Sequence, residues 1–156
     1  MNIDKPLTLR AAHVSDAATI ASMSRLLIEH GLRWRWNTAR VRRAISDKDT
    51  MVLIGSIEGT VTGFAIMKFR DEESHLFLIA VAPRFQRTGV GGALLTWLEK
   101  SCRTAGIRHV RVEMRESNNP ARQFYEHLGF RFVRKIPNYY DNAEAAVVMV
   151  RTLSTC

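Results

Sequence analysis

Short apolar or alternating segments recur along the chain and predict strands, because a half-buried strand turns every second side chain towards the core. The segments of this kind are residues 7–12, 51–57, 61–69, 76–81, 110–114, 130–133 and 145–150. The pair Glu58-Gly59 separates two of them and is typical of a hairpin turn. The pattern therefore predicts a mixed sheet of six to seven strands.

Apolar positions at helical spacing lie between these segments. The helices expected from them cover residues 15–31, 37–46, 89–104 and 118–129. Strands joined through the helix at 89–104 should be parallel, because a crossover helix returns the chain in its original direction. We therefore expect an α/β fold, one domain over residues 1–156, with helices on both faces of the sheet.

Composition narrows the class of protein. Hydrophobic residues make up 46% of the 156 residues and charged residues 24%, as in ordinary globular domains. No apolar stretch approaches the ~18 residues of a membrane span, and no apolar segment of a secretory signal is visible near Met1. Cys102 and Cys156 give no disulfide framework. We expect a cytoplasmic protein that does not bind membranes, and the five histidines show no metal-ligand spacing.

The charge balance is strongly basic. The formal net charge is +8 and the sequence pI is about 10.2. A basic surface attracts polyanions, which include nucleic acids, acidic proteins and cofactors that carry several phosphates. Charge alone does not choose among these partners.

A glycine-rich segment lies between the apolar run 76–81 and the helix that follows it. Its residues, with the preceding glutamine, are Gln86, Arg87, Thr88, Gly89, Val90, Gly91 and Gly92. Such a turn gathers backbone N–H groups that have no acceptor inside the helix, at the positive end of the helix dipole. This is a phosphate-binding arrangement. A P-loop is excluded because no Gly-Lys-Ser/Thr follows, and the dinucleotide fingerprint lacks its third glycine.

Two blocks of the chain resemble a known family. The segment from Val81 to Leu95 resembles motif A of the GCN5-related N-acetyltransferase (GNAT) superfamily, with its Gln/Arg-x-x-Gly-x-Gly/Ala core. The segment Asn118-x-x-Ala121-x-x-Phe124-Tyr125-Glu126-x-x-Gly129-Phe130 resembles motif B. The resemblance implies a GNAT-like domain with a mostly antiparallel sheet and acetyl-CoA as the acetyl donor.

Within the superfamily the chain is similar to the bacterial ribosomal-protein alanine N-acetyltransferases. Three further segments carry this similarity, namely 76–81, 112–118 and 134–140. They match the strand that binds pantetheine, the segment with the catalytic glutamate and an Arg-x-x-Tyr-Tyr substrate loop. The acceptor implied is an amine, most specifically the α-amino group of a protein N-terminus.

The resemblance assigns roles that each have a structural alternative. Glu113 is the expected general base, or a solvated position on an alternating strand. Tyr125 is the expected acid for the leaving thiolate, or a core aromatic residue. The backbone of Ile79, Ala80 and Val81 is expected to bind pantetheine as an added strand, or these residues only form a buried strand.

The remaining candidate residues are less sharply assigned. Asn118 either caps its helix or contacts the cofactor. Trp36, Tyr139 and Tyr140 either line an acceptor groove or pack against the core.

Three functions remain open at this point. The first is acetylation of a protein N-terminus, and the second is acetylation of a small amine on the same fold. A small cationic acceptor would need acidic residues around its pocket, whereas residues 31–45 contain five arginines and no acidic residue. The third is nucleic-acid binding by the Trp/Arg segment 33–43, although no nucleic-acid-binding motif is present. The sequence does not indicate an oligomeric state.

Overall fold

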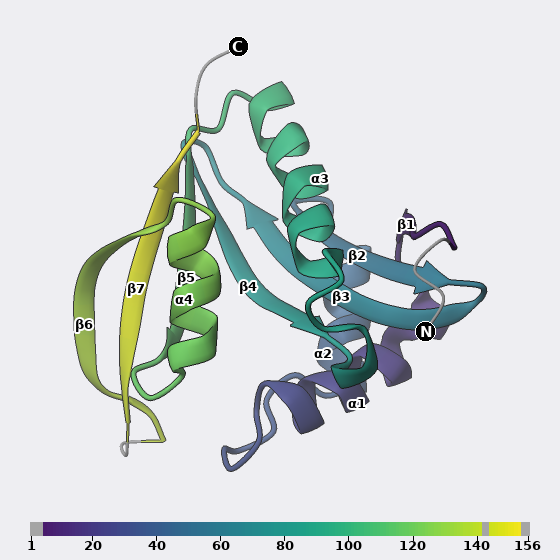
Figure 1. Ribbon diagram of the computed structural model, residues 1–156, viewed down its shortest axis with the longest axis horizontal. Coiled ribbons are helices and arrows are strands. Elements are labelled where there is room, and N and C mark those ends of the chain that lie inside the picture. Colours follow the sequence, from purple (N-terminus) through teal and green to yellow (C-terminus); the bar gives the residue numbers. More distant parts are fainter. Residues whose placement is uncertain (1–4, 142–143, 154–156) are drawn as a thin grey trace.

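The computed structural model describes residues 5–141 and 144–153 (Figure 1). The strands are β1 (Thr8–Ala11), β2 (Thr50–Ile57), β3 (Thr60–Phe69), β4 (Glu73–Val81), β5 (His109–Arg115), β6 (Arg131–Tyr140) and β7 (Glu144–Thr152). The helices are α1 (Ala17–Leu27), α2 (Thr38–Ser46), α3 (Val90–Thr104) and α4 (Asn119–His127). The predicted α/β class is confirmed, and the sheet has seven strands, within the predicted range of six to seven.

The strands form a single sheet in the order β1-β2-β3-β4-β5-β7-β6. Neighbouring strands are antiparallel except β4 and β5, which the α3 crossover makes parallel as expected. Glu58 and Gly59 both adopt positive φ, 50° and 77°, and form the predicted hairpin turn between β2 and β3.

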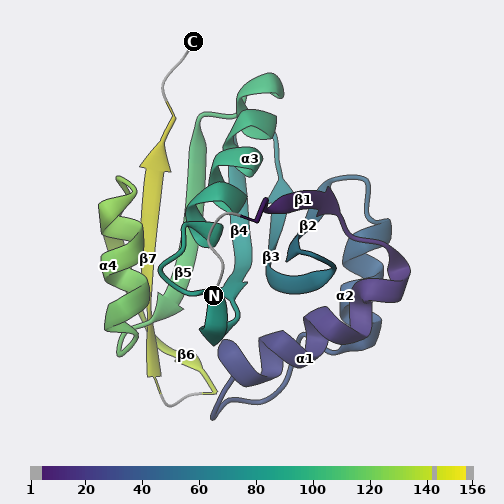
Figure 2. The same cartoon turned by 45° about the vertical axis from the view of Figure 1, so that its right-hand side comes forward.

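Helices cover both faces of the sheet (Figures 1 and 2). Helices α3 and α4 lie over one face, where apolar side chains of α3 such as Leu94 and Leu98 are fully buried against the strands. Helices α1 and α2 cover the other face through residues that include Ile20 and Val41, also fully buried. The sheet therefore separates two hydrophobic cores.

Local sequence signals fix the ends of two helices that matter for the site. The Asn37 side chain accepts a hydrogen bond from the Arg40 amide at 3.0 Å and begins α2. The Asn118 side chain accepts one from the Ala121 amide at 3.2 Å and begins α4. Gly129, with φ of 90°, follows α4 as predicted.

The expectation of a loop at 134–140 is wrong. These residues continue β6, which pairs with β7 from Arg131 to Tyr140 and carries a register irregularity between Ile136 and Tyr140. Asn138 within this irregularity has φ of 55°. The segment is bulged where it passes the site, which turns Tyr139 and Tyr140 towards the strands beside it.

The parallel strands β4 and β5 separate along their length. Their described pairing runs from Glu73 with His109 to Leu76 with Val112 and then stops. Beyond this point the two strands diverge, and Figure 1 shows the gap widening towards the N-terminal end of α3. The separation leaves one backbone edge of β4 free over residues 77–81.

Gly63 on β3 supports the far end of β4. A Cβ at this position would lie 2.7 Å from the Ala80 carbonyl oxygen and 3.3 Å from a methyl group of Val90. Because backbone cannot yield easily, only glycine fits between the end of β4 and the start of α3.

Candidate active site

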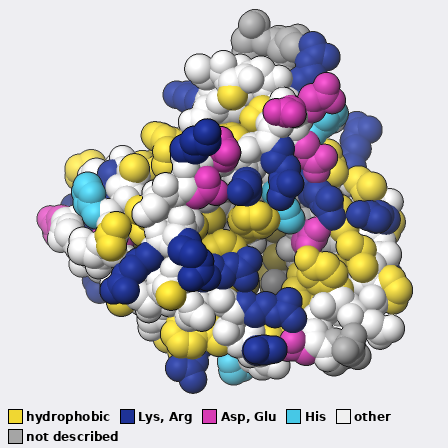
Figure 3. Space-filling model, turned by 180° about the vertical axis from the view of Figure 1, so that it is seen from behind, with side chains coloured by type: hydrophobic (Ala, Val, Ile, Leu, Met, Phe, Trp, Pro, Cys, Tyr) yellow, Lys and Arg dark blue, Asp and Glu magenta, His cyan; other side chains and the backbone are white. Residues whose placement is uncertain are grey.

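A cavity of about 410 Å³ opens where β4 and β5 diverge. It is bordered by the segment between α1 and α2, by β4, β5 and α4, and by the end of β6. Figure 3 shows this face of the molecule as a hollow with apolar side chains at its floor and Lys and Arg side chains around it. The volume falls within the range of small-ligand and cofactor sites.

Ten of the predicted site residues line this cavity, although they come from distant parts of the chain. They are Trp36, Ile79, Ala80, Val81, Gln86, Glu113, Asn118, Tyr125, Tyr139 and Tyr140. The remaining predicted residues, Arg87 to Gly92, lie outside the cavity lining, at the N-terminal end of α3.

The α3 N-terminus has the backbone geometry of an anion site. Gly89 is the N-cap, with φ of 89° and no side-chain capping hydrogen bond. Arg87 also has positive φ, 64°. The first amides of α3 thus lack intrahelical acceptors, and a Cβ at Gly92 would meet nothing within 4 Å. Open space at exposed amides fits a phosphate group, so these residues suit a phosphorylated cofactor.

Two residues of the glycine segment have structural roles as well. A Cβ at Gly91 would lie 3.0 Å from the Phe124 ring, so Gly91 allows α3 and α4 to pack closely. The Val90 side chain is buried in the core beneath the helix start. Of the segment's glycines, Gly89 and Gly92 have the open surroundings that a ligand needs.

The β4 edge supplies backbone groups to the cavity. Ile79, Ala80 and Val81 pair with β3 on one side, through partners at residues 63–65. Their other side faces the cavity, beyond the last pair with β5. The Gln86 amide nitrogen donates a hydrogen bond to the Val81 carbonyl at 3.1 Å. An extended ligand arm can therefore lie along β4 as an added strand.

Glu113 lies level with the point of divergence, and its side chain is 10% exposed. Its Oε1 accepts a hydrogen bond from the Arg111 guanidinium at 2.5 Å. Its Oε2 accepts one from the Tyr139 hydroxyl. Arg111 was not predicted as a site residue. The alternation of residues 110–114 could have indicated it, because residues 111 and 113 share one face of β5.

Tyr125 packs as a core aromatic residue, and its role as the acid for the leaving thiolate stays a prediction. Its ring packs edge-on against Phe124 and Phe130, at centroid distances of 5.3 and 5.1 Å, and the residue is 7% exposed. Tyr125 is also among the residues that line the cavity. Burial raises the pKa of Tyr125 above its ordinary value, and the charge of Tyr140 adds to this. The phenol therefore stays protonated at neutral pH.

The sequence contains three tyrosines, and all three line this cavity. Burial and, to a smaller extent, the hydrogen bond to Glu113 together raise the pKa of Tyr139 to about 12. Burial also raises the pKa of Tyr140. Burial lowers the pKa of His75, and the charge of Glu113, which acts to raise this pKa, offsets the effect only in part. The cavity thus keeps its tyrosines neutral, and it disfavours the charged form of His75.

The acceptor-side wall depends on a buried carboxylate that the sequence did not reveal. Glu29 is 7% exposed and accepts backbone hydrogen bonds from Arg35 at 2.7 Å and Trp36 at 3.2 Å, and one from the Ser24 hydroxyl at 2.8 Å. These bonds fix the segment between α1 and α2. Trp36 is itself buried, so packing and cavity lining are both its roles.

Comparison with known proteins identifies the family. The model of the acetyltransferase (GNAT) family matches residues 20–130. The chain belongs to this family. It is accordingly an acyltransferase of the N-acetyltransferase class, as the two sequence blocks predicted.

Individual relatives agree with this assignment. The [ribosomal protein bS18]-alanine N-acetyltransferase of Escherichia coli is 38% identical over 99 residues, which are 62% of this chain and 67% of that protein. The aligned stretch thus covers only about two thirds of the length of such curated relatives. Ard1 from Thermoplasma volcanium has a TM-score of 0.83 and 27% identity, covering 95% of this chain and 98% of its own.

One solved structure of the same fold was determined with its cofactor. The protein yncA from Salmonella typhimurium, solved with acetyl-CoA, has a TM-score of 0.78 and 22% identity over 97% of this chain and 96% of its own. Within the described residues, no helix is long and apolar enough to cross a membrane. The same residues contain no group of three or more His, Cys, Asp or Glu side chains that could hold a metal ion.

Proposed function

We propose that the protein transfers the acetyl group of acetyl-CoA to the α-amino group of a protein N-terminus. The observation that carries the proposal is the divergence of β4 and β5, which brings a free strand edge and Glu113 into one cavity beside the α3 N-terminus. The E. coli relative, named for alanine N-acetylation of a ribosomal protein, supports an N-terminal acceptor.

The donor side uses backbone groups. Amides at Gly89 to Gly92 bind the diphosphate, and the β4 edge at Ile79–Val81 binds the pantetheine arm. Four residues of strand separate Val81 from Phe77, or about 13 Å at ~3.3 Å per residue. The bound arm therefore leads from the α3 N-terminus towards Glu113. When bound, acetyl-CoA supplies the acetyl group as a thioester, whose C–S bond breaks as the C–N bond forms.

Glu113 takes a proton from the acceptor amine. Only a neutral amine is nucleophilic, and an α-amino group with a pKa of about 8 is roughly a tenth neutral at pH 7. A lysine side chain, with a pKa of about 10.4, is far less so. A single carboxylate, acting directly or through a water molecule, is sufficient for an N-terminal acceptor. Arg111 holds the Glu113 carboxylate in place.

Tyr125 provides a proton for the departing thiolate. Its raised pKa keeps the hydroxyl protonated, and its packing against Phe124 and Phe130 fixes the direction of that hydroxyl. Because a thiol of pKa about 8.5 already leaves readily, the contribution of Tyr125 to the rate is modest. Asn118 caps α4 and so holds Tyr125 at the cavity.

The proposal assigns the protein to the reducing cytoplasm. This is supported by Cys102 on the buried side of α3, a free thiol that makes no disulfide in the described chain.

The donor site is tested by the melting temperature with and without acetyl-CoA. Ligand that binds the folded state raises it. Gly92→Leu fills open space, so without ligand this variant should melt at the same temperature as the original protein. Acetyl-CoA should raise its melting temperature much less. An undiminished rise would contradict the proposed diphosphate site.

The reaction itself is tested by CoA release with a peptide that begins with alanine, compared with the same peptide blocked at its N-terminus and with spermidine. We expect turnover only with the free peptide. Turnover with spermidine alone would favour the small-amine function.

A further inference from the structure

The acceptor side of the cavity is bordered by basic side chains. Arg33, Arg35 and Arg40, from the segment between α1 and α2 and from α2 itself, line the same cavity as Glu113. The carboxylates among the lining residues are largely engaged. Glu29 is buried and bound to backbone amides. Glu113 is paired with Arg111.

Asp141 neutralises only part of this basic border. It forms an ion pair with Arg35 at 3.1 Å and accepts a hydrogen bond from the Arg33 amide at 2.9 Å. Among the described residues, the guanidinium groups of Arg33 and Arg40 have no carboxylate partner. The border therefore carries excess positive charge.

Arg40 is held in a fixed position. Asn37 caps the start of α2 and so fixes the backbone at Arg40. The Arg40 guanidinium lies 3.9 Å from the centroid of the Trp36 ring. Burial lowers the pKa of Arg40. The negative charge of Glu29 raises this pKa in part, and the positive charges of Arg35 and Arg43 lower it. A stacked guanidinium with its edge free is pre-organised to bind a carboxylate with two hydrogen bonds.

The location of these arginines separates them from the donor site. Trp36 contacts Phe77 at a ring-centroid distance of 5.7 Å, so Arg40 lies at the Phe77 end of the β4 edge. The α3 N-terminus lies at the Val81 end, where Gly91 approaches the Val81 side chain. The arginines thus border the path of the acceptor rather than the phosphates of the donor.

We propose that Arg33, Arg35 and Arg40 select acceptors that carry acidic side chains within the first few residues after the acetylated one. This inference rests on the proposed function and specifies its substrate class. A peptide with its α-amino group at Glu113 runs out of the cavity past these side chains. A nucleic acid is a less suitable occupant, because these three arginines line a cavity that also contains three acidic residues.

The test uses three peptides that begin with alanine and continue with two glutamates, two glutamines or two lysines. Acetylation is followed by CoA release. We expect kcat/KM to be highest for the glutamate peptide, about tenfold above the glutamine peptide, which is the factor expected for one charge-assisted hydrogen-bonded pair. The lysine peptide should be the poorest substrate. Added salt should reduce the differences.

Variants assign the preference to particular residues. Arg40→Gln should lower kcat/KM for the glutamate peptide about tenfold and leave the glutamine peptide and the KM for acetyl-CoA unchanged. Asp141→Asn keeps an acceptor for the Arg33 amide and releases Arg35, so it should raise kcat/KM for the glutamate peptide. The matched control is Arg42→Gln, which removes the same charge from an exposed position on α2 outside the cavity. It should leave the preference intact.

Several results would overturn the inference. One is equal kcat/KM for the three peptides, or a preference for lysine. Another is a rise in the KM for acetyl-CoA on Arg40→Gln that is the same with every peptide, since this would assign Arg40 to the donor. Loss of RNA oligonucleotide binding on Arg40→Gln, with peptide kinetics unchanged, would assign it to nucleic acid. If no peptide is acetylated although acetyl-CoA still raises the melting temperature, the proposed function fails first and this inference with it.

Discussion

The Tyr139 hydroxyl on β6 donates a hydrogen bond to Oε2 of Glu113 on β5, while Arg111 binds the other carboxylate oxygen. Both oxygens of the proposed base are thus engaged before an acceptor arrives. Because Tyr139 is 39% exposed, its hydroxyl can be displaced by an incoming amine or a water molecule. Under the proposed function, we expect the acceptor nitrogen to take the place of the Tyr139 hydroxyl at Glu113.

Replacement of Glu113 by glutamine is expected to lower kcat about 100-fold near neutral pH, at the lower end of the range for general-base catalysis. The amide oxygen still accepts a hydrogen bond from Arg111, so the local structure should remain. The deficit should shrink above about pH 8, where α-amino groups lose their proton unaided. The measurement is CoA release against pH with an alanine peptide.

Acetyl-CoA affinity provides the control for this variant. Glu113 lies at the opposite end of the β4 edge from the α3 N-terminus, so calorimetry should give an unchanged Kd. Equal kcat values for Glu113→Gln and the original protein at every pH would remove Glu113 as the base.

The three tyrosines are expected to titrate above their ordinary range. Burial raises the pKa of all three, that of Tyr139 to about 12, from the ordinary value of 10.0. In the unfolded chain the phenols ionise first, so the stability that burial confers is present below pH 10 and is lost as the pH rises towards 12. Near-ultraviolet absorbance should show delayed ionisation in the folded protein. It should show ordinary ionisation in denaturant.

Glu113→Gln also tests this titration. Removing the carboxylate removes a negative charge and a charged hydrogen-bond acceptor beside Tyr139, so the pKa of Tyr139 should fall towards that of a free phenol. Identical absorbance titrations of the two proteins would contradict the Tyr139–Glu113 hydrogen bond.

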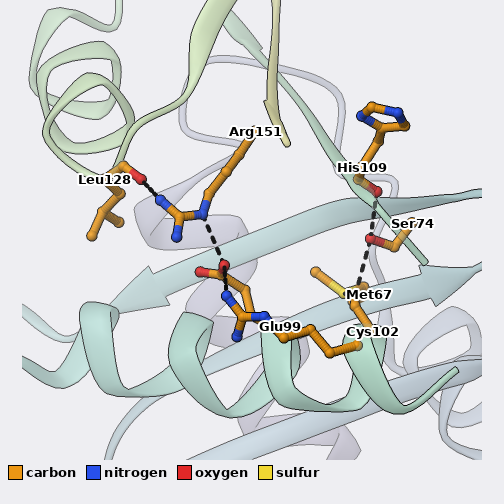
Figure 4. Close-up of polar contacts among 8 residues, drawn as sticks. Met67, Ser74, Glu99, Cys102, His109, Leu128 and Arg151 are labelled. Carbon is orange, nitrogen blue, oxygen red and sulfur yellow. Dashed lines mark hydrogen bonds and ion pairs between the residues drawn. The ribbon is translucent and has the colours of Figure 1, made fainter. Parts of the chain in front are cut away.

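Arg151 on β7 is expected to hold α3 and α4 together. Figure 4 shows its guanidinium between the Glu99 carboxylate, at 2.8 Å, and the Leu128 carbonyl, to which it also donates a hydrogen bond. Glu99 is 6% exposed. Arg151→Met leaves this carboxylate with only the more distant Arg103, at 4.0 Å, and should lower the free energy of unfolding by about 2–4 kcal/mol, measured with urea.

The double variant Glu99→Gln/Arg151→Met supplies the control. It removes the buried charge as well as its partner, so it should recover part of the lost stability. A single Arg151→Met variant as stable as the original protein would show that the ion pair contributes nothing. Because Leu128 follows α4 directly, Arg151→Met should also shift Tyr125 on that helix. This shift should lower the rate of acetyl transfer.

The sequence predicted the elements well because their signals are local. The hairpin at Glu58-Gly59, the Asn118 cap and the glycines after α3 and α4 each act within a few residues. The parallel pairing of β4 and β5 also followed, since a helix between two strands leaves one favoured connection. The glycine segment indicated an anion site for the same reason.

Contacts between distant segments were not predictable in this way. Segment 134–140 was expected as a loop, but pairing with β7 makes it a strand. Glu29 carries no distinguishing signal in the sequence, although its carboxylate accepts hydrogen bonds from the backbone of Arg35 and Trp36. The sequence showed that the segment 33–43 is basic, but it did not show which arginines have a role in the site. Which of them border the cavity depends on how α2 packs against the sheet.

The missing side chain at Gly63 has a consequence for how the family fold can vary. This residue lies outside the cavity lining, yet both halves of the proposed donor site, the end of β4 and the first turn of α3, rest against it. A single added methyl group would act as a wedge that tilts the strand edge relative to the helix. In the proposed donor site, the spacing between the end of β4 and the start of α3 therefore depends on Gly63, a residue that lies behind the site.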